Sequence, residues 1–387
     1  MRILHTSDWH IGKRLLGRER LAEQADALDE IAALCAKEQI DVVLVAGDVF
    51  DTYLPSAEAE DLFYEKIKKI AGDTRAVVVI SGNHDDNVRL SAATPLCEPQ
   101  GIYIYGNYGY VPKRGGNRPV RIADSGPNHI VLEKGGDKIF VNILPYPNET
   151  RLKEDKNPDE TFLDKMSRWM QSGQAKNTDG LPSVFLSHLF VAGGQVSEGE
   201  RDIDLGGARS VPLSLLPKAD YVALGHLHKC QQFKGNVCYS GAILQYAFDE
   251  AGAAKSVFIF DLDRTGVHNM ERRILQSGRS LVRLEANGIA AAEELLYRYE
   301  NSFIELTIHL DEPMASSQVK QLKDANEGLI SIVPLIGSAL PGENASARKQ
   351  LSPIELFCEF YKSRFSEQPS DEMKELFVSA MEESNET

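Results

Sequence analysis

The sequence lacks the long apolar runs and the paired cysteines that mark membrane proteins and disulfide-bonded proteins. None of its stretches reaches the roughly 18 apolar residues of a membrane-spanning helix. Its first residues contain neither an apolar signal core nor a small-residue cleavage site. The five cysteines are odd in number, scattered and free of any Cys-x-x-Cys motif. We therefore expect reduced thiols in a cytoplasmic protein that does not enter a membrane.

Positive charge is also scarce. The chain has 42 Lys and Arg against 57 Asp and Glu, a formal net charge of −15. Because phosphate binding favours Lys and Arg, this balance at first argues against a nucleic-acid partner. However, bound divalent cations reverse the local electrostatics of a site, and basic residues gather near the N-terminus while the segment from Leu351 onward is acidic. Net charge therefore neither establishes nor excludes DNA.

At 387 residues the chain is too long for one ordinary domain, and we expect two or three. In the first half, apolar runs alternate with helical patterns. The pattern predicts strands at 2–6, 41–46 and 76–80 and helices at 19–38 and 56–71. This order favours a parallel sheet with right-handed crossovers. Ligands of such sheets gather at the carboxyl ends of the strands.

After residue 100 the pattern changes to short strands. A hairpin is predicted over 130–144, followed by a helix near 162–170. Further strands are predicted at 183–186, 221–224, 237–239 and 257–262, of which the last two would complete a second sheet. We expect two sheets packed face to face with helices outside them, and a domain boundary in the polar stretch 264–278.

The predicted domains are a first domain over 1–268, a small α+β domain over 278–336 and a C-terminal helical segment over 350–387. The second reads as strand, helix, strand, helix, strand. The third has two apolar helical stripes, which suit docking of a partner, although packing against the chain's own core would also explain them. The stripes consist of Ile354, Phe357, Cys358 and Tyr361 in one helix and of Leu376, Phe377 and Met381 in the other.

Side chains of the kinds that bind metals follow most of the strands. They are Asp8, His10, Asp48, Asn83, His84, His188, His226 and His228. Carboxylate, amide and imidazole groups are ligands of divalent cations, and two ions about 3.5–4 Å apart need a shared ligand. The carboxylate of Asp48 can bridge. Any one of these histidines alone would more often be structural, but their joint occurrence favours a two-metal centre that hydrolyses phosphate esters.

These motifs resemble the calcineurin-like metallophosphoesterase family. More narrowly, segments 4–12, 186–194 and 219–228 are similar to the SbcD-type nuclease subunits of that family. The resemblance is strong over residues 1–265 and continues more weakly to the C-terminus. It implies an α/β fold of four layers, a β-sandwich flanked by helices, with a small α+β capping domain and a C-terminal helical tail.

The resemblance also implies two divalent metal ions, with Mn²⁺ as the usual ion. The ligands would be Asp8, His10, Asp48 and His228 at the first site and Asp48, Asn83, His188 and His226 at the second. His84 would be catalytic, stabilising the developing charge or protonating the leaving oxygen, which suits an imidazole.

Two nearby carboxylates, Asp51 and Asp85, have two interpretations. They either orient His84 through its other ring nitrogen or serve as turn and capping carboxylates. We take Asp51 as the candidate that assists His84 in catalysis.

Basic residues lie close to two of the motifs in the sequence. The candidates for holding DNA phosphates are Lys13, Arg14, Arg18 and Arg20, just after His10, and Arg89, just after the His84 loop. For the first four, a solvated start of a helix is the competing interpretation.

Three functions are compatible with these motifs. The first is a DNA nuclease working with an SMC-like ATPase, SbcC, and the second is a phosphatase or phosphodiesterase for a small or protein substrate. The third, a scaffold that has lost its metals, would lack ligands, and none is missing. Protein phosphatases of the superfamily typically have Arg before Gly-Asn-His, where this chain has Ser81.

The nuclease is therefore favoured. The resemblance implies that it cleaves double-stranded ends and single-stranded or hairpin DNA in repair, replication and recombination. It also implies a homodimer within a heterotetramer that includes the ATPase.

Overall fold

The computed structural model describes residues 1–147, 160–197 and 210–337, together with the short pieces 357–358, 361–362, 368–370, 373–374 and 377. The chain divides into two compact units. One comprises Met1–Ile308 with Ser316–Val333, and the other comprises His309–Ala315 with Pro334–Thr387. Among the helices of the described ranges, none has the length and apolar character needed to span a bilayer.

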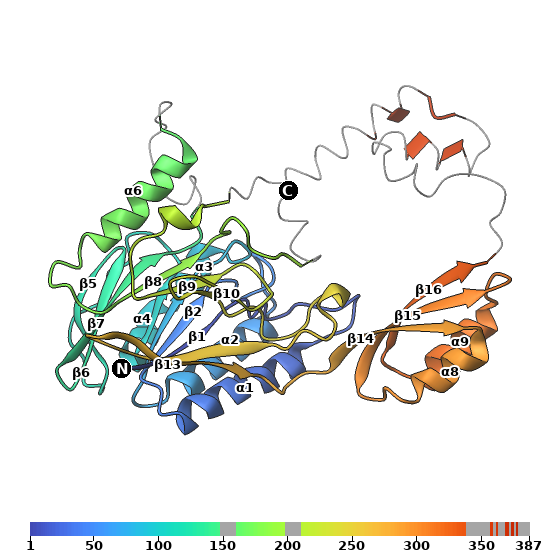
Figure 1. The fold of residues 1–387 in the computed structure, drawn as a ribbon, viewed down its shortest axis with the longest axis horizontal. Coiled ribbons are helices and arrows are strands. Elements are labelled where there is room, and N and C mark those ends of the chain that lie inside the picture. The colour runs from blue at the N-terminus through green and yellow to red at the C-terminus, as the bar shows by residue number, and fades with distance from the viewer. Residues whose placement is uncertain are drawn as a thin grey trace. The chain divides into compact units, whose positions relative to one another are not determined.

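A six-stranded sheet has the order β13-β12-β1-β2-β3-β4 (Figure 1). Its parallel strands are β1 (Arg2–Thr6), β2 (Val42–Ala46), β3 (Ala76–Ile80) and β4 (Ile102–Tyr105). Helices α1 (Leu21–Lys37) and α2 (Ala57–Ala71) connect the first three. Strands β2 and β3 are continuous apolar runs, as expected of strands covered on both faces. The predicted alternation of strands and helices is confirmed.

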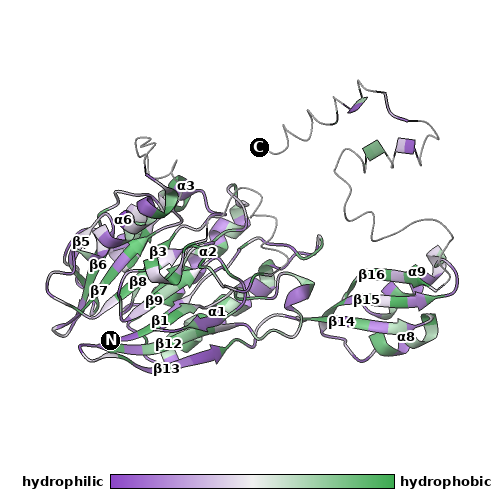
Figure 2. Cartoon of the chain, turned by 45° about the horizontal axis from the view of Figure 1, so that its top comes forward, coloured by the Kyte–Doolittle hydropathy of each residue, from purple (hydrophilic) through white to green (hydrophobic). Residues whose placement is uncertain are grey.

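The other two strands of this sheet, β12 (Ser256–Asp263) and β13 (Gly266–Ile274), correct the prediction. β12 pairs antiparallel with β1, so the prediction that 257–262 completes the second sheet is wrong. Its apolar pattern shows that the strand is buried but not which strand it pairs with. β13 lies at the edge, and its hydrophilic residues stand out in Figure 2. Edge exposure explains the polar composition of 264–278, and the strand continues past residue 268.

The seven-stranded sheet has the order β10-β11-β9-β8-β7-β6-β5. The hairpin of β6 and β7 is confirmed, and β7, β8 and β9 run parallel. His188, the last residue of β8, is in register with Gly225, the last residue of β9. The strands are β5 (Arg121–Gly126), β6 (His129–Lys134), β7 (Asp137–Leu144), β8 (Ser183–His188), β9 (Tyr221–Gly225), β10 (Gln231–Phe233) and β11 (Val237–Tyr239).

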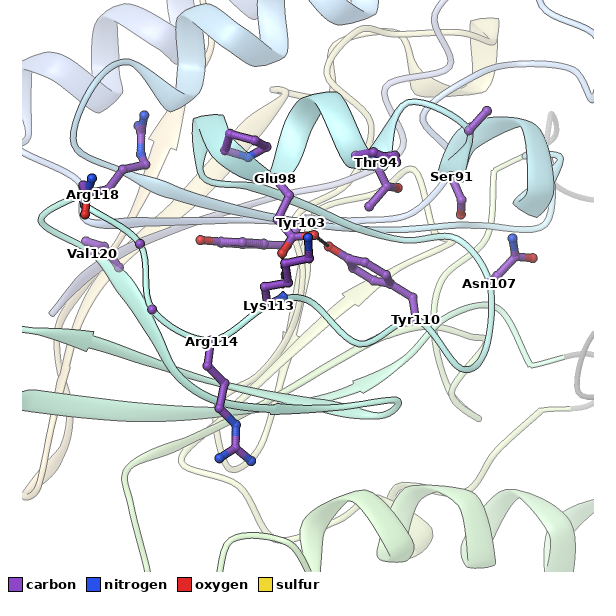
Figure 3. A pocket seen from close by; sticks show the side chains of 16 residues that line it. Ser91, Thr94, Glu98, Tyr103, Asn107, Tyr110, Lys113, Arg114, Arg118 and Val120 are labelled. Atoms are coloured by element: carbon purple, nitrogen blue, oxygen red, sulfur yellow. Dashed lines mark hydrogen bonds between the residues drawn. The ribbon is translucent and has the colours of Figure 1, made fainter.

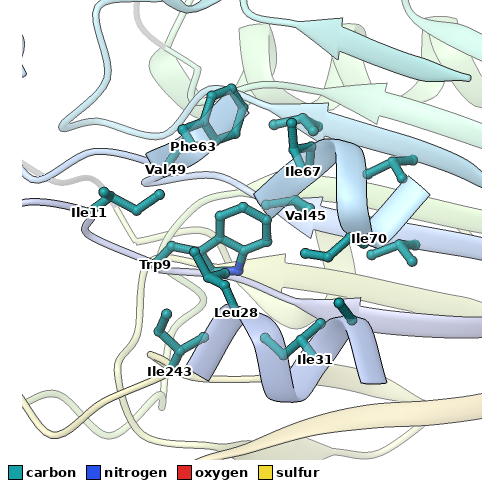
Figure 4. Close-up of a cluster of buried hydrophobic side chains, with 14 of the residues drawn as sticks. Trp9, Ile11, Leu28, Ile31, Val45, Val49, Phe63, Ile67, Ile70 and Ile243 are labelled. Atoms are coloured by element: carbon teal, nitrogen blue, oxygen red, sulfur yellow. The ribbon is translucent and has the colours of Figure 1, made fainter. Parts of the chain in front are cut away.

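Three clusters of buried side chains lie between four layers. The first packs α1 and α2 against the six-stranded sheet, and Trp9 lies among the side chains of both helices (Figure 4). The second fills the space between the sheets. The third packs α6 (Phe162–Gln174) against the seven-stranded sheet. The predicted sandwich flanked by helices is confirmed.

The remaining elements include the predicted α+β segment. It has the sheet order β14-β15-β16, with two helices between the strands, as predicted. Its elements are β14 (Ser280–Asn287), α8 (Ile289–Leu296), β15 (Ser302–Leu310), α9 (Ser316–Ala325) and β16 (Leu329–Ile336). Short helices elsewhere are α3 (Asn87–Ser91), α4 (Thr94–Cys97), η1 (Glu98–Gln100), η3 (Leu213–Leu215) and η4 (Phe248–Glu250).

Near the C-terminus the described residues of the predicted helical segment are helical at 357–358, 361–362, 373–374 and 377. The rings of Phe357 and Phe377 stack with their centroids 4.4 Å apart. Ile354, Leu376 and Met381 lie outside the described residues. The domain boundaries and the docking role of this segment stay predictions.

Candidate metal centre

The metal-type side chains follow the carboxyl ends of strands in both sheets. Asp8 follows β1, Asp48 follows β2, and His188 ends β8. Backbone hydrogen bonds join the first two loops, since Asp8 N donates to Gly47 O and His10 N donates to Asp48 O, each at 3.0 Å. The packing of the two sheets therefore brings together residues that are far apart in the sequence.

The backbone at the centre is strained. Asp8, His10, Asp48 and His226 have φ values of 51°, 45°, 47° and 107°, in the left-handed region that L-residues rarely adopt. Each such residue costs roughly 1 kcal/mol or more, and such strain gathers at functional sites. The strained loops are tied together because the carboxylate of Asp8 accepts from His226 N at 2.9 Å. The carboxylate of Asp48 accepts from His84 N at 2.9 Å.

Two glycines of the motifs allow a close approach of the loops. A Cβ atom on Gly82 would lie 2.1 Å from Asp48 Oδ1, and one on Gly225 would lie 1.8 Å from Ala46 O. Neither position therefore accommodates a side chain without movement of the neighbouring residue. The close packing of the loops therefore explains why glycine occupies these positions in the Gly-Asn-His and Gly-His-x-His motifs.

At the first predicted site, the ring nitrogens of two histidines face each other. The Nε2 atoms of His10 and His228 are 3.0 Å apart. Asp8 offers a ligand atom within 4.8 Å of both rings. His10 Nε2 is also 3.6 Å from Asp48 Oδ2.

The contacts of Nδ1 in these two rings determine whether Nε2 carries a hydrogen atom or a lone pair. His10 Nδ1 is 3.3 Å from Asp51 Oδ1, and His228 Nδ1 is 3.2 Å from Glu250 Oε1. A carboxylate beside Nδ1 favours hydrogen on that nitrogen, which places the lone pair of each neutral ring on Nε2. Two lone pairs that face each other at 3.0 Å repel unless they share a cation. The donor set therefore fits a divalent metal ion.

At the second predicted site, ring nitrogens converge on an amide oxygen. Asn83 Oδ1 is 2.8 Å from His188 Nε2 and 3.0 Å from His226 Nδ1. His188 Nδ1 donates its proton to Ala46 O at 2.8 Å, so Nε2 is the ring nitrogen that faces the centre. That Nε2 is 3.4 Å from Asp48 Oδ2, the same oxygen that approaches His10. Asp48 is therefore placed to serve both sites.

Burial and charge set the protonation of the centre. Burial raises the pKa of Asp8 to about 6 and lowers the pKa of His10 to about 3. Burial alone would raise the pKa of Asp48, but His188 and His84 hold it well below its usual value. Burial opposes the charged form of His188, yet the carboxylates of Asp48 and Asp8 raise its pKa to about 9. Two buried carboxylates thus face one imidazolium at neutral pH, a shortage of positive charge that cations would correct.

All seven predicted ligands therefore lie together. Six of them are buried and Asn83 is half-buried. Their role as ligands stays a prediction.

His84 lies beside them, with its ring centroid 4.8 Å from that of His10. Its Nδ1 is 2.7 Å from the main-chain oxygen of Asp51. Its Nε2 is buried without a hydrogen-bond partner among the residues that the structure describes. A buried ring nitrogen of this kind is costly unless a ligand engages it.

Asp51 contacts the predicted ring nitrogen of His84, but through its main-chain carbonyl and not through its carboxylate. The carbonyl of Asp51 contacts His84, whereas its carboxylate contacts His10 and accepts from Lys13 Nζ at 2.9 Å. A backbone contact of this kind depends on the loop conformation and not on residue type, so the sequence does not reveal it. For Asp85 the capping interpretation holds, because its carboxylate accepts from three backbone N–H groups.

The sequence did not reveal Glu250 as part of the centre. Its side chain is fully buried and contacts His228. Burial alone would raise the pKa of Glu250, but the Lys255 ammonium lowers it to about 2. The one signal in the sequence is a carboxylate close behind the apolar run Ala-Ile-Leu-Gln-Tyr-Ala-Phe, and such a signal is weak.

Among the basic candidates, Arg20 is a wrong prediction. Its side chain is 0% exposed, its guanidinium pairs with Glu23 and donates to Gln245 O at 2.9 Å, and it lies over the ring of Phe303. A buried guanidinium with these partners does not reach a phosphate.

The other four basic candidates are at least partly exposed. Lys13 pairs with Asp51, Arg14 pairs with Glu19, Arg18 donates to Glu327 O at 3.3 Å and Arg89 pairs with Glu60. Surface ion pairs of this kind are weak and exchange readily for other partners. Contact of these four residues with DNA stays a prediction.

A cavity of about 680 Å³ lies apart from these residues (Figure 3). Its lining comes from residues 91–120 and includes Tyr103 and Tyr110, whose hydroxyl donates to Glu98. None of the predicted ligands lines it. The cavity is therefore separate from the candidate metal centre.

Comparison with known proteins agrees with this geometry. Residues 1–230 match the calcineurin-like phosphoesterase family. The chain is 38% identical to SbcD of the nuclease SbcCD from Bacillus subtilis, over 98% of its own length and 97% of that protein. Two solved structures give TM-scores of 0.38 and 0.37, a dimetal phosphatase from Danio rerio and TT1561 of Thermus thermophilus, at 13% and 10% identity. They cover 72% and 70% of this chain and 99% and 98% of their own. The chain belongs to the calcineurin-like phosphoesterase family, on the branch that contains the SbcD component of nuclease SbcCD.

Proposed function

We propose that this chain is the nuclease subunit of an SbcCD-type complex, a metal-dependent hydrolase that cleaves phosphodiester bonds of DNA and works with an SMC-like ATPase, SbcC. The observation that carries the proposal is the 38% identity to SbcD of Bacillus subtilis, which extends over 98% of the chain. The similarity therefore includes the α+β segment and the C-terminal segment as well as the phosphoesterase part. A phosphatase acting on a small or protein substrate would not account for similarity over those segments.

The centre would hold two divalent ions, which we propose to be Mn²⁺. Oxygen and imidazole ligands suit this ion. When bound, the two ions would polarise the phosphate and make water a better nucleophile. The ligands would be Asp8, His10, Asp48 and His228 for one ion and Asp48, Asn83, His188 and His226 for the other.

His84 would act on the phosphate or on the leaving oxygen. The carbonyl of Asp51 accepts its Nδ1 proton at 2.7 Å and so fixes the ring. Nε2 is then the atom that faces substrate. In the protonated ring it would donate a proton to the leaving oxygen, the role of a general acid.

The DNA would be held through its backbone. Lys13, Arg14, Arg18 and Arg89 carry positive charge at or near the surface and would neutralise phosphates without reading bases. Double-stranded and hairpin DNA without sequence preference are the proposed substrates. We further propose a homodimer within a heterotetramer. The five free cysteines support a location in the reducing cytoplasm.

A nuclease assay with a His84→Ala variant tests the proposal. The assay contains Mn²⁺ and is run with and without the ATPase. The wild-type protein is expected to cleave DNA, and cleavage is expected to stop when a chelator is added. His84→Ala is expected to lose about 100-fold or more of the cleavage rate while still binding metal. His268→Ala, an exposed histidine of β13, is the matched control and is expected to cleave normally.

Two results would contradict the proposal. Unchanged cleavage by His84→Ala would remove this histidine from the reaction. Hydrolysis of small phosphomonoesters, with no cleavage of DNA even beside the ATPase, would favour the phosphatase instead.

A further inference from the structure

Glu250 is a carboxylate with no exposed surface, at the end of the short helix η4. One of its oxygens, Oε1, is 3.2 Å from His228 Nδ1. The other, Oε2, accepts from Lys255 Nζ and from Tyr246 N, the latter at 3.4 Å. Both oxygens are thus engaged, one of them by the ring of a predicted metal ligand.

Stability alone is a poor explanation for this arrangement. Burying a carboxylate and an ammonium removes both charges from water at a large desolvation cost, and apolar residues of similar volume commonly serve the fold as well or better. Glu250 and Lys255 are nevertheless both buried, 0% and 8% exposed. Lys255 Nζ also donates to the main-chain oxygen of His228 at 2.9 Å. The buried pair therefore contacts both the ring and the backbone of one residue.

The contact at His228 differs from those at the other histidines of the centre. His188 Nδ1 donates to a main-chain carbonyl, and so does His84 Nδ1. His10 shares its carboxylate, Asp51, with Lys13, and the Asp51 side chain is 23% exposed. Among the described residues of the centre, His228 is the histidine whose Nδ1 contacts a fully buried carboxylate. A carboxylate at Nδ1 makes Nε2 a stronger donor to a metal than a carbonyl does.

The loop that carries Glu250 is held by one glutamine. Gln245 Nε2 donates to Glu250 O at 3.0 Å and to Ala253 O at 2.9 Å. Its Oε1 accepts from the backbone N–H of Leu281 at 2.7 Å. These bonds fix the backbone at Glu250 and three residues after it, so the carboxylate is preorganised against the ring.

We propose that Glu250 is a positioning residue of the first metal site. It accepts the Nδ1 proton of His228 and thereby fixes the tautomer and the ring orientation that present Nε2 to the ion. The inference rests on the proposed two-metal centre and adds a residue that acts on the metal through His228.

A titration of the full-length protein with Mn²⁺, followed by electron paramagnetic resonance, tests the role of Glu250 without using activity. The variants are Glu250→Ala, which removes the acceptor, and Glu250→Gln, which keeps an acceptor oxygen without charge. The matched control is Asp249→Ala, which removes the neighbouring carboxylate, paired with Lys229. Glu250→Ala is expected to lower the affinity for one of the two ions by about 10- to 100-fold, the usual effect of removing a residue that orients a metal ligand. Glu250→Gln is expected to recover most of that loss and Asp249→Ala to bind as wild type does.

Other results would overturn the inference. Glu250→Ala that binds both ions like wild type would show that the carboxylate does not act on His228. Equal weakening in Glu250→Ala, Glu250→Gln and Asp249→Ala would show a general disturbance of the loop. If Glu250→Ala does not fold, Glu250→Met fills the same space without an acceptor and carries the same expectation. A wild-type protein that binds no Mn²⁺ would contradict the proposed function itself. If the wild type binds two ions and Glu250→Ala binds them equally well, only the inference about Glu250 is contradicted.

Discussion

At the scale of single residues, Asp48 lies where the two groups of predicted ligands meet. Its Oδ2 is 3.6 Å from His10 Nε2 and 3.4 Å from His188 Nε2, and its Oδ1 accepts from the backbone of His84. One carboxylate thus contacts the first site, the second site and the catalytic candidate. A positive φ and a preceding glycine place it there.

Substitution of Gly82 tests this close packing. In Gly82→Ala the new Cβ would overlap Asp48 Oδ1, so the carboxylate has to move. We expect a loss of about 1–3 kcal/mol in the free energy of unfolding and weaker binding of Mn²⁺ at both sites. Chemical denaturation and metal titration measure the two effects.

The matched control is Gly135→Ala. Unlike Gly82, Gly135 has a positive φ, which strains any side chain there, but nothing lies within 4 Å of its Cβ position. The Gly135→Ala variant is expected to lose stability without any change in Mn²⁺ binding. Unchanged metal binding in Gly82→Ala would show that the approach of this loop to Asp48 is not needed.

His5 makes stability depend on pH. Its ring is buried in β1, with Nδ1 3.0 Å from the Tyr221 hydroxyl, and burial lowers its pKa from 6.5 to about 3. The neutral ring of the folded protein is favoured above pH 6.5, and that contribution is lost as the pH falls from 6.5 toward 3, where the unfolded chain binds the proton first. The expected loss is about 1 kcal/mol per pH unit.

Urea unfolding of metal-free protein at pH 7.5 and pH 5 measures the effect of His5. Since Gln does not titrate, His5→Gln is expected to lose less stability between these two pH values than wild type does. His268→Gln, in which an exposed ring is removed, is expected to behave as wild type. An identical pH dependence of stability in His5→Gln and wild type would show that His5 does not contribute to it.

Residue types and their order were enough to predict that the seven candidate ligands and His84 lie together, because each motif follows a strand end and the sheets bring strand ends together. The sequence could not show which contacts the backbone makes. The carbonyl of Asp51 at His84 and the burial of Arg20 depend on loop conformation and on packing against Phe303. Glu250 lies 22 residues from His228 in a loop without a motif.

At the scale of elements, the first three parallel strands of the six-stranded sheet were predictable because their apolar runs are closely followed by Gly or Asp and alternate with amphipathic helices, whereas β4 was not predicted. The placement of β12 beside β1 was not, since pairing joins residues far apart, such as Arg2 and Asp261. An edge strand such as β13 has polar residues over much of its length and therefore resembles a linker.

The loop from Gln245 to Lys255 is the element whose bracing can be tested. Gln245→Ala would leave the N–H of Leu281 and the carbonyls of Glu250 and Ala253 without this partner. We expect a loss of about 1–3 kcal/mol in stability and faster amide hydrogen exchange in residues 246–253. Exchange measured by mass spectrometry in this segment checks the expectation, and exchange as slow as in wild type would contradict the bracing role. Gln232→Ala, at an exposed position in β10, is the control.

At the scale of the whole molecule, the C-terminal segment is predicted to dock the ATPase. Phe357 and Phe377 stack on each other. Replacing both with Ala is expected to abolish co-purification with the ATPase, because the apolar contact is lost, while the chain alone keeps its metal-dependent cleavage. Met373→Ala, a partly exposed neighbour, is the control.

The competing interpretation of this segment gives a different result. If the two phenylalanines pack against the chain's own core, the double variant would lose thermal stability and cleavage together, and the ATPase would still bind whatever remained folded. Co-purification and melting temperature measured on the same preparation distinguish the two.

The pair of metal ions is the claim on which the mechanism depends, and anomalous scattering at the manganese edge from a crystal soaked in Mn²⁺ tests it most directly. Two peaks about 3.5–4 Å apart, one on each side of Asp48, are the predicted result. The first should lie against His10 and His228 and the second against Asn83 and His188. A map with no peak at these residues, or with a single ion that Asp48 does not contact, would contradict the proposed centre.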